Sequence, residues 1–244
     1  PLQTLVDTTL VNDMIRSMLD MYDITGELPI WPLASGETGT MIGYHAASVI
    51  ADAYLKGIRG YDAEKALDAM IRSSNINKKG SDYYVAQGFI PSNIKRESVS
   101  CTLEYAYDDW CILQVARKLN RPQAELDKWA ARARNYRNVF DPETRLMRGR
   151  LRDGKFQAPF SPYKWGDAFT EGNSWHYTWS VFHDVEGLVD LMGGREQFVQ
   201  MLDSVFVVPP IYDDSYYGFR IHEITEMQVA DMGNYAHGNQ PAQH

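Results

Sequence analysis

The segment FTEGNSWHYTW, residues 169–179, places the carboxylate of Glu171 among an asparagine, a serine and several aromatic rings. On a solvated helix a glutamate often has a lysine or arginine three or four residues away, because such pairs stabilise the helix modestly. No lysine or arginine lies between Lys164 and Arg195. A glutamate beside apolar rings loses solvation, which raises its pKa and suits it to act as a general acid near neutral pH. The pattern therefore indicates a working carboxyl group at Glu171.

A structural role for Glu171 is the alternative. Placed just before a predicted helix, it could favour the positive end of the helix dipole by about 0.3 to 1 kcal/mol. Asn173 and Ser174 are better capping residues, because their short side chains reach the free amides of the first turn. With the cap assigned to one of them, Glu171 has no structural task.

Aromatic side chains gather around this acid: Trp165, Trp175, Tyr177 and Trp179. A second segment of this kind, LPIWPLASGETGTMIGYH, holds Trp31 between prolines and continues to Glu37 and His45. Rings beside acids suit a sugar, whose apolar face stacks on a ring while its hydroxyls need fixed hydrogen-bond partners. Taken alone, each ring fits a hydrophobic core better. Their position beside acids in predicted loops favours a sugar site.

The segment HEITE supplies His222, Glu223 and Glu226. If it is helical, His222 and Glu226 share one face, so a metal ion or a hydroxyl-rich ligand could bridge them; a solvated helix face is the alternative. The chain has no HExxH pattern and no set of cysteine ligands, which disfavours a zinc hydrolase. Oxygen ligands of this kind favour calcium instead.

Two adjacent acids, Asp108 and Asp109, lie in the apolar segment EYAYDDW. Neighbouring residues on a helix point about 100 degrees apart, so both cannot face the core equally. We expect one of them to pair with an arginine, such as Arg148 or Arg150, in a structural role.

Composition narrows the class of protein. The chain has 244 residues, 44% of them hydrophobic and 23% charged, which is typical of a globular protein. A net charge of -8 disfavours binding to nucleic acid, which needs clustered lysine and arginine. Cys101 and Cys111 would lie about 15 Å apart on a helix, too far for a disulfide, so buried thiols are expected. No apolar run is long enough for a membrane span, and no GxSxG, P-loop or dinucleotide motif occurs.

The elements that must position these residues are nearly all helical. Three- and four-residue spacing of apolar side chains predicts helices over residues 9–24, 41–56, 63–74, 100–120, 122–138, 174–192 and 195–206. In the first of these we expect one buried face, formed by Leu10, Met14, Met18 and Met21. Segments 81–99 and 140–167 are predicted to be loops, and 206–221 to be irregular. Long loops between helix pairs favour an all-α toroid of antiparallel helix pairs over a bundle with short connections.

The ordered motifs also resemble a known family. WPLASGETGTMIGYHAASVIADAYLKGI, EYAYDDW, NVFDPETRLMRGR, FTEGNSWHYTW, HDVEGLVDLMGG and YAHGNQPAQH are similar to the catalytic domain of glycoside hydrolase family 92, the calcium-dependent exo-α-mannosidases. The resemblance implies an all-α fold, an (α/α)6 toroid, and an inverting enzyme that removes terminal mannose, often α-1,2-linked, from glycans. Residues 1–244 would be the central part of this toroid, packed against an N-terminal β-sandwich domain outside the chain.

The resemblance also implies roles for individual residues. Glu171 would be the general acid; His222 and Glu223, with the rings of Trp31 and Trp175, would bind the mannose. Ligands at or near the calcium ion would be Glu226, Asn239 and Gln240, although the family often has glutamate at the position of Gln240.

Inversion needs a second carboxylate that activates water. The family has it in a motif downstream of GNQP, so this chain alone is expected to be inactive. A non-catalytic, carbohydrate-binding helical scaffold is the competing hypothesis. A helical enzyme acting on isoprenoids is disfavoured, because no DDxxD-like motif occurs. The family habit suggests a periplasmic or secreted protein.

Overall fold

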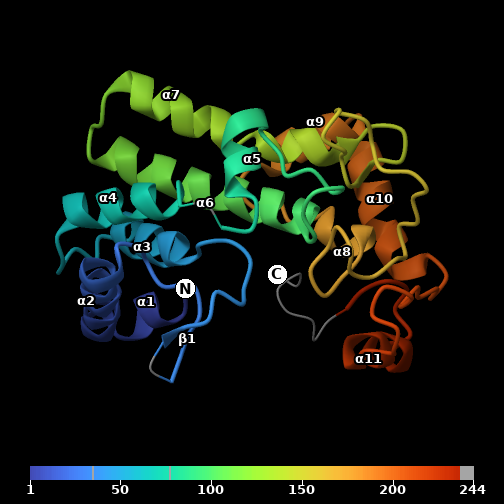
Figure 1. Cartoon of the computed structure of the whole chain (residues 1–244), viewed down its shortest axis with the longest axis horizontal. Coiled ribbons are helices and arrows are strands. Elements are labelled where there is room, and N and C mark those ends of the chain that lie inside the picture. Colours follow the sequence, from blue (N-terminus) through green and yellow to red (C-terminus); the bar gives the residue numbers. More distant parts are fainter. Residues whose placement is uncertain (35, 77, 237–244) are drawn as a thin grey trace. The chain divides into compact units, whose positions relative to one another are not determined.

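The computed structural model describes residues 1–34, 36–76 and 78–236. It is mostly helical, with 51% helix and 5% strand. The helices of the first half are α1 Gln3–Val6, α2 Thr8–Thr25, α3 Ala46–Leu55, α4 Ala63–Ser73, α5 Ser81–Gln87 and α6 Ser98–Lys118. Those of the second half are α7 Gln123–Arg132, the 3-10 helix Asn135–Val139, α8 Ser174–Tyr177, α9 Val185–Met192, α10 Arg195–Val207 and α11 His222–Ala230 (Figure 1). Two antiparallel hairpins are formed by β1 Pro32–Leu33 with β2 Gly36–Glu37 and by β3 Phe140–Asp141 with β4 Leu146–Met147.

The chain divides into two compact units. The first unit comprises Pro1–Ala86 and Glu104–Arg134, and the second comprises Gln87–Leu103 and Asn135–His244. The division falls within helix α6: its residues up to Leu103 belong to the second unit, and those from Glu104 belong to the first. Each unit has its own buried core and is described by itself.

In the first unit, α2 packs against α3 and α4, which also contact each other. Helix α2 is capped at its start by Asp7, whose side chain accepts a hydrogen bond from the Leu10 amide, and at its end by Gly26, which has a left-handed φ of 80°. Both ends follow the usual capping rules. Asp62 caps α4 in the same way, through the Lys65 amide.

The buried face of α2 differs from the predicted one. Val11, Ile15 and Leu19 are buried, whereas Leu10 and Met14 are 39% and 43% exposed. Each buried residue follows a predicted one by a single position, which rotates the face by about 100 degrees. The mixed apolar sequence of α2 allows both faces, and packing against α3 and α4 selects one.

Other boundaries also differ from those expected. Helix α3 begins at Ala46 rather than Met41, because the residues before it form the loop that leads from the β1–β2 hairpin. The predicted loop 81–99 contains α5, seven residues long. The predicted helix 122–138 ends at Arg132 and is followed by a 3-10 turn.

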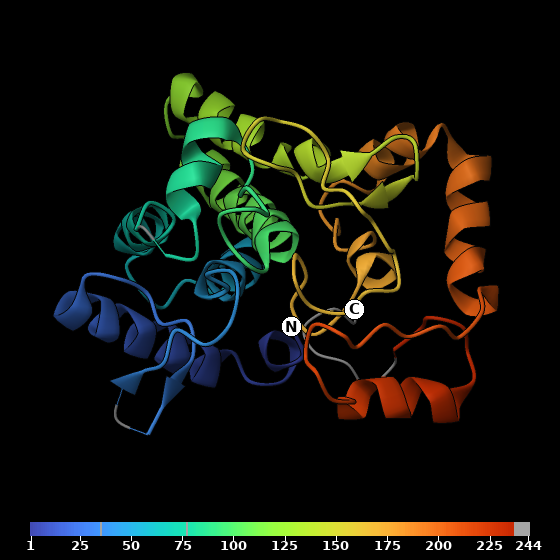
Figure 2. The same ribbon diagram turned by 45° about the vertical axis from the view of Figure 1, so that its right-hand side comes forward.

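In the second unit, α9 and α10 contact each other and are joined at Gly193 and Gly194, whose φ angles are 95° and 113°. Figure 2 shows α10 and the segment 208–221 that returns the chain to α11. The prediction of one continuous helix over residues 174–192 is wrong, because α8 ends at Tyr177. A separate helix, α9, follows the cap residue Asp184, whose side chain accepts a hydrogen bond from the Gly187 amide. Thr178 bonds back to the Ser174 carbonyl at 2.7 Å, a contact that competes with helix continuation.

Cys101 and Cys111 are both buried, as the sequence predicts. Among the residues that the structure describes, no helix has the length and apolar character needed to cross a membrane.

Candidate active site

The loop that carries Glu171 is fixed at its end by the cap of α8. Asn173 accepts from the His176 amide at 3.3 Å, and His176 Nδ1 accepts from the Asn173 amide at 3.0 Å. Both residues are buried. Burial lowers the pKa of His176 to about 4, so its ring is neutral and free to accept this bond. Asn173 therefore caps α8. Glu171 is not needed for that structural role.

Trp165 joins the α8 loop to α11. The Trp165 ring is fully buried and meets the His176 ring edge-on, with centroids 4.9 Å apart. The same ring packs in a cluster with Ile224 and Met227 of α11. Helix α11 is therefore attached to the loop that ends at Glu171, through an apolar contact that fixes its first turn nearby.

The first turn of α11 presents a histidine and a glutamate. His222 Nδ1 lies 3.2 Å from Glu223 Oε2, and the His222 side chain is 78% exposed while that of Glu223 is 12% exposed. The HEITE segment is helical, as expected. Glu223 is therefore the more enclosed of the two groups, and His222 is the more accessible.

Glu171 lies close to both of these residues. Its pKa is raised, first by partial burial and then by the negative charges of Glu223 and Glu97, with His222 acting in the opposite direction. Glu171 keeps part of its surface exposed and has a left-handed φ of 46°. The Tyr217 hydroxyl forms a hydrogen bond with its backbone. A carboxyl group with a raised pKa at an accessible position can remain protonated and donate a proton.

Of the three predicted metal ligands, only Glu226 lies within the residues that the structure describes. Glu226 is exposed on α11, and Asn239 and Gln240 lie outside the described residues. Calcium takes six to eight oxygen ligands. Within residues 1–34, 36–76 and 78–236, no three His, Cys, Asp or Glu side chains form a group suited to a metal ion. The calcium site therefore stays a prediction, and no chemical step is assigned to the ion.

Trp175 is a buried residue of α8. It is 8% exposed and clusters with Leu146 and Val205. It also lines a cavity of about 270 Å³, together with Trp179 and Phe182. Glu171 is absent from the lining of this cavity, so Trp175 acts here mainly as a core residue with one ring face toward a hollow.

Trp31 belongs to the first unit and is 41% exposed. The carboxylate of Glu37 accepts from the backbone amides of Ile30, Trp31 and Gly39 at 2.7, 2.9 and 2.7 Å. Partial burial raises the pKa of Glu37, but these amides outweigh it and the pKa is lowered overall. Glu37 therefore remains ionised and holds the loop that presents the Trp31 ring.

The adjacent acids of α6 are both fully buried, which corrects the expectation that the two cannot face the core equally. Asp109 accepts from Arg132 Nε at 2.7 Å and from the Tyr44 and Tyr84 hydroxyls at 2.7 and 2.8 Å. The partner arginine is therefore Arg132 of α7, not an arginine from 148–150. Arg148 pairs instead with Asp141, at 2.9 Å.

Asp108 pairs with a histidine. His45 lies between two carboxylates, with Nδ1 3.0 Å from Asp108 and Nε2 2.9 Å from Glu104. Burial lowers the pKa of His45, but Asp108 and Glu104 outweigh it and raise the pKa to about 11. The His45 ring is consequently a permanent imidazolium, which suits a fixed ion pair rather than an acid or base that must change charge.

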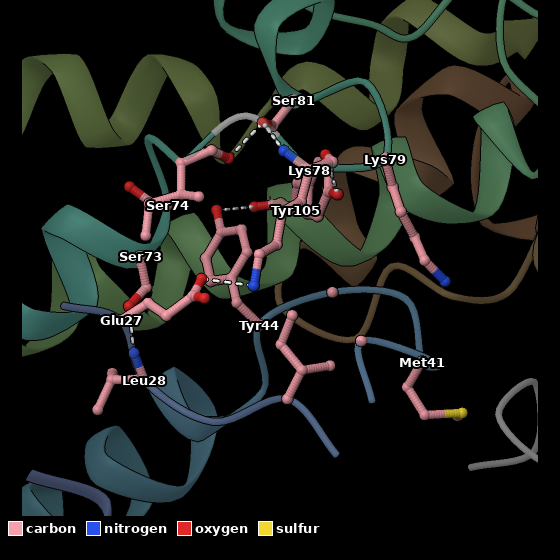
Figure 3. A pocket seen from close by; sticks show the side chains of 14 residues that line it. Glu27, Leu28, Met41, Tyr44, Ser73, Ser74, Lys78, Lys79, Ser81 and Tyr105 are labelled. Carbon is pink, nitrogen blue, oxygen red and sulfur yellow. Dashed lines mark hydrogen bonds and ion pairs between the residues drawn. The ribbon is translucent and has the colours of Figure 1, made fainter. Parts of the chain in front are cut away.

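A small pocket in the first unit lies beside this network and is drawn in Figure 3. Its walls are held by an ion pair of Lys78 with Glu27 and by a bond from the Tyr105 hydroxyl to the Lys78 carbonyl at 3.0 Å. The cavity holds about 30 Å³, which is the space of a water molecule or two. A sugar ring does not fit.

Two residues of the second unit that act on Glu171 are not indicated by the sequence pattern. Glu97 and Tyr217 both face Glu171, yet they lie 74 residues before it and 46 residues after it in the numbering. The only local signal was the position of Glu97 just before the longest predicted helix. No spacing rule relates segments this far apart.

Comparison with known proteins identifies the family of the chain. The family model for the glycosyl hydrolase family 92 catalytic domain matches residues 1–244. A family 92 α-mannosidase of Bacteroides thetaiotaomicron, solved in complex with mannoimidazole, is 38% identical, with a TM-score of 0.87 over 99% of this chain. An inverting family 92 mannosidase of the same organism is 43% identical, with a TM-score of 0.84 over 99% of the chain. A protein of Arthroderma benhamiae, named an uncharacterized secreted glycosidase, is 28% identical over 231 residues, which cover 78% of this chain.

The helical fold and these matches define a part of an (α/α)6 toroid, and the predicted fold class is confirmed. The chain belongs to glycoside hydrolase family 92. It spans about a third of the length of these relatives: 32% and 34% of the two mannosidases and 30% of the Arthroderma protein.

Proposed function

We propose that the protein containing this chain is an inverting exo-α-mannosidase and that Glu171 is its general acid. The supporting observation is the position of Glu171 beside Glu223 and His222, in surroundings that raise its pKa. A carboxyl group with a raised pKa keeps its proton to higher pH than an ordinary glutamate does, and can deliver it to the leaving oxygen of a glycosidic bond. The substrate class follows the family, and an α-1,2 linkage is our more specific proposal.

In this mechanism the first turn of α11 binds the terminal mannose. Glu223 accepts from sugar hydroxyls, and His222 is exposed enough to reach the same ring. The rings of Trp31 and Trp175 are proposed to stack on sugar faces, as aromatic side chains commonly do in such sites. The base that activates water is assigned to no residue of this chain, because the family resemblance puts it downstream of the motifs described.

Calcium remains part of the proposal on the basis of family membership. Glu226 offers one oxygen ligand, and Asn239 and Gln240 would add amide oxygens beyond the described residues. When bound, a calcium ion would supply an electrostatic contact for sugar hydroxyls. Loss of activity on chelation and its return with calcium would support this assignment; full activity in the chelator would contradict it.

Further features of the whole protein are proposed on the same basis. We place it in the periplasm or outside the cell, consistent with the name of the Arthroderma relative. An N-terminal β-sandwich domain is proposed to pack against this part of the toroid.

A carbohydrate-binding scaffold without catalysis is the competing function. The two are separated by Glu171→Gln in the full-length protein, assayed with a mannobiose and by calorimetric binding of mannose. An enzyme loses turnover by about 10² to 10⁴-fold while its sugar affinity stays close to that of the wild type. The exposed Glu143 of the second unit gives the control Glu143→Gln, which should leave turnover unchanged. No turnover in the wild-type protein, with measurable mannose binding, would favour the scaffold.

A further inference from the structure

The loop segment that leads to Glu171 is hydrogen-bonded to residues at the start of helix α6. The Glu97 amide donates to the Asp167 carbonyl at 2.7 Å, and the Val99 amide donates to the Ala168 carbonyl at 2.9 Å. Two segments of the second unit, more than sixty residues apart in sequence, are thus joined by backbone hydrogen bonds. The start of α6 therefore sets the path of the loop that carries the carboxyl group.

Thr170, the residue immediately before Glu171, is held at three points. Its amide donates to Ser100 Oγ at 2.9 Å, its hydroxyl donates to Glu97 Oε1 at 3.0 Å, and its carbonyl accepts from the Tyr177 hydroxyl at 2.7 Å. Thr170 is 8% exposed. All of its hydrogen-bonding groups are used, so the backbone that leads into Glu171 is fixed.

Both glutamates have left-handed backbones, with φ of 55° at Glu97 and 46° at Glu171. This conformation is disfavoured for residues other than glycine and persists only where surrounding contacts enforce it. The hydrogen bonds at Thr170 provide such contacts from both sides of the junction. Strained residues of this kind gather at sites that need one fixed geometry.

We infer that Glu97 is a positioning residue for Glu171: its carboxylate holds the Thr170 hydroxyl, and its negative charge faces the proton donor. This rests on the proposed function and names a residue that acts through the general acid rather than on the substrate. The charge of Glu97 and the hydrogen bond to Thr170 have separate consequences, which two substitutions can separate.

The first consequence concerns the charge state of Glu171. The groups that face it are Glu97 at the start of α6, His222 and Glu223 on α11, and Tyr217. Negative charge at Glu97 raises the pKa of Glu171, because it disfavours a second carboxylate nearby. Loss of that charge lowers the pKa of Glu171, so the acid loses its proton at a lower pH.

The second consequence concerns geometry. A proton donor must lie within hydrogen-bond distance of the leaving oxygen, and small displacements from the reactive geometry can lower the rate about 100-fold. Without the Thr170 hydroxyl bond, one of the three anchors next to Glu171 is lost. The effect should be large for a leaving group that needs a proton and small for one that does not.

The test uses the full-length protein and two variants. Glu97→Gln keeps an oxygen for the Thr170 hydroxyl but removes the charge; its alkaline limb of kcat/KM on a mannobiose should move to lower pH, with the low-pH plateau retained. Thr170→Val removes the hydroxyl and keeps the shape; kcat on a mannobiose should fall about 10- to 100-fold, with little change on a dinitrophenyl α-mannoside. Thr170→Ser, which keeps the hydroxyl, should restore the rate.

Glu143→Gln, which removes an exposed charge that is not among those acting on Glu171, is the control and should leave the pH profile in place. The inference is overturned if Glu97→Gln leaves the alkaline limb of kcat/KM where it is. It is also overturned if Thr170→Val lowers kcat equally on the mannobiose and on the dinitrophenyl α-mannoside. Failure of the proposed function looks different: turnover would then survive Glu171→Gln. A protein that needs Glu171 but ignores Glu97 would contradict the inference alone.

Discussion

The ion pair between Arg132 and Asp109 gives a prediction whose size follows from burial. The Arg132 side chain is 10% exposed and that of Asp109 is fully buried, with Nε 2.7 Å from Oδ2. Arg132→Met leaves Asp109 with two tyrosine donors and no opposite charge. Breaking a buried pair in this way costs about 3 to 5 kcal/mol. Asp109→Asn should cost a similar amount, because it leaves the guanidinium unpaired.

The double variant Arg132→Met/Asp109→Asn should cost less than the sum of the two, by about 1 to 3 kcal/mol, because neither charge is then left alone. The measurement is urea unfolding followed by tryptophan fluorescence, which reports on Trp129 below the Arg132 guanidinium. Arg134→Met, two residues along at an exposed position, is the control and should lie within about 0.5 kcal/mol of the wild type.

The pH dependence of the Arg132→Met variant adds a second readout. Burial already raises the pKa of Asp109, and removal of Arg132 takes away the charge that opposes this. A carboxyl whose folded pKa lies above its unfolded value loses stability as pH rises, so the deficit should be smaller near pH 4 than at pH 8. Additive costs for the two substitutions, or a deficit that is constant with pH, would refute this account of the pair.

Three further predictions concern the second unit, each measured by the free energy of unfolding. Asn173→Ala should lose about 1 to 2 kcal/mol, because it removes the cap of α8 and a bond to Asn234 at 3.0 Å. Gly166→Ala should lose at least about 1 kcal/mol, because φ is +78° and the added methyl would collide with the Tyr216 ring. The free energy of unfolding of the wild type should fall by up to about 3 kcal/mol as the pH is lowered from 6.5 to 4. The reason is that His176 takes up a proton at a higher pH in the unfolded chain than in the folded one. The variant His176→Asn, which has no titrating group at this position, should show a flatter pH profile. A cost below about 0.3 kcal/mol for either substitution, or equal slopes with and without the histidine, would contradict these assignments.

Local signals in the sequence predicted the elements that are fixed locally. Gly26 ends α2 and Asp62 begins α4 because each acts on backbone groups of its own helix. The helical class and the family followed from periodicity and ordered motifs. The break after Tyr177 was missed, since apolar residues continue through it and only the Asp184 cap marks the new start.

Pairings between distant segments could not be predicted from local signals. Arg132 was overlooked as the partner of Asp109, because a buried arginine looks the same in sequence as an exposed one. Glu97 was overlooked for a similar reason: its importance arises only when α6 meets the loop before Glu171. Glu171 was identified correctly as a carboxyl group with a raised pKa, but the nearby charges of Glu97 and Glu223 contribute to the shift together with burial.

The proposed role of Glu171 as proton donor is tested most directly by leaving-group dependence. The measurement is kcat/KM of the full-length protein on a series of aryl α-mannosides whose phenols span a wide range of pKa, for the wild type and for Glu171→Gln. A proton donor makes the wild-type rates nearly independent of the phenol, whereas the variant should match the wild type on the most acidic phenol and fall steeply on the least acidic one. Parallel lines for the two proteins would show that Glu171 does not protonate the leaving oxygen.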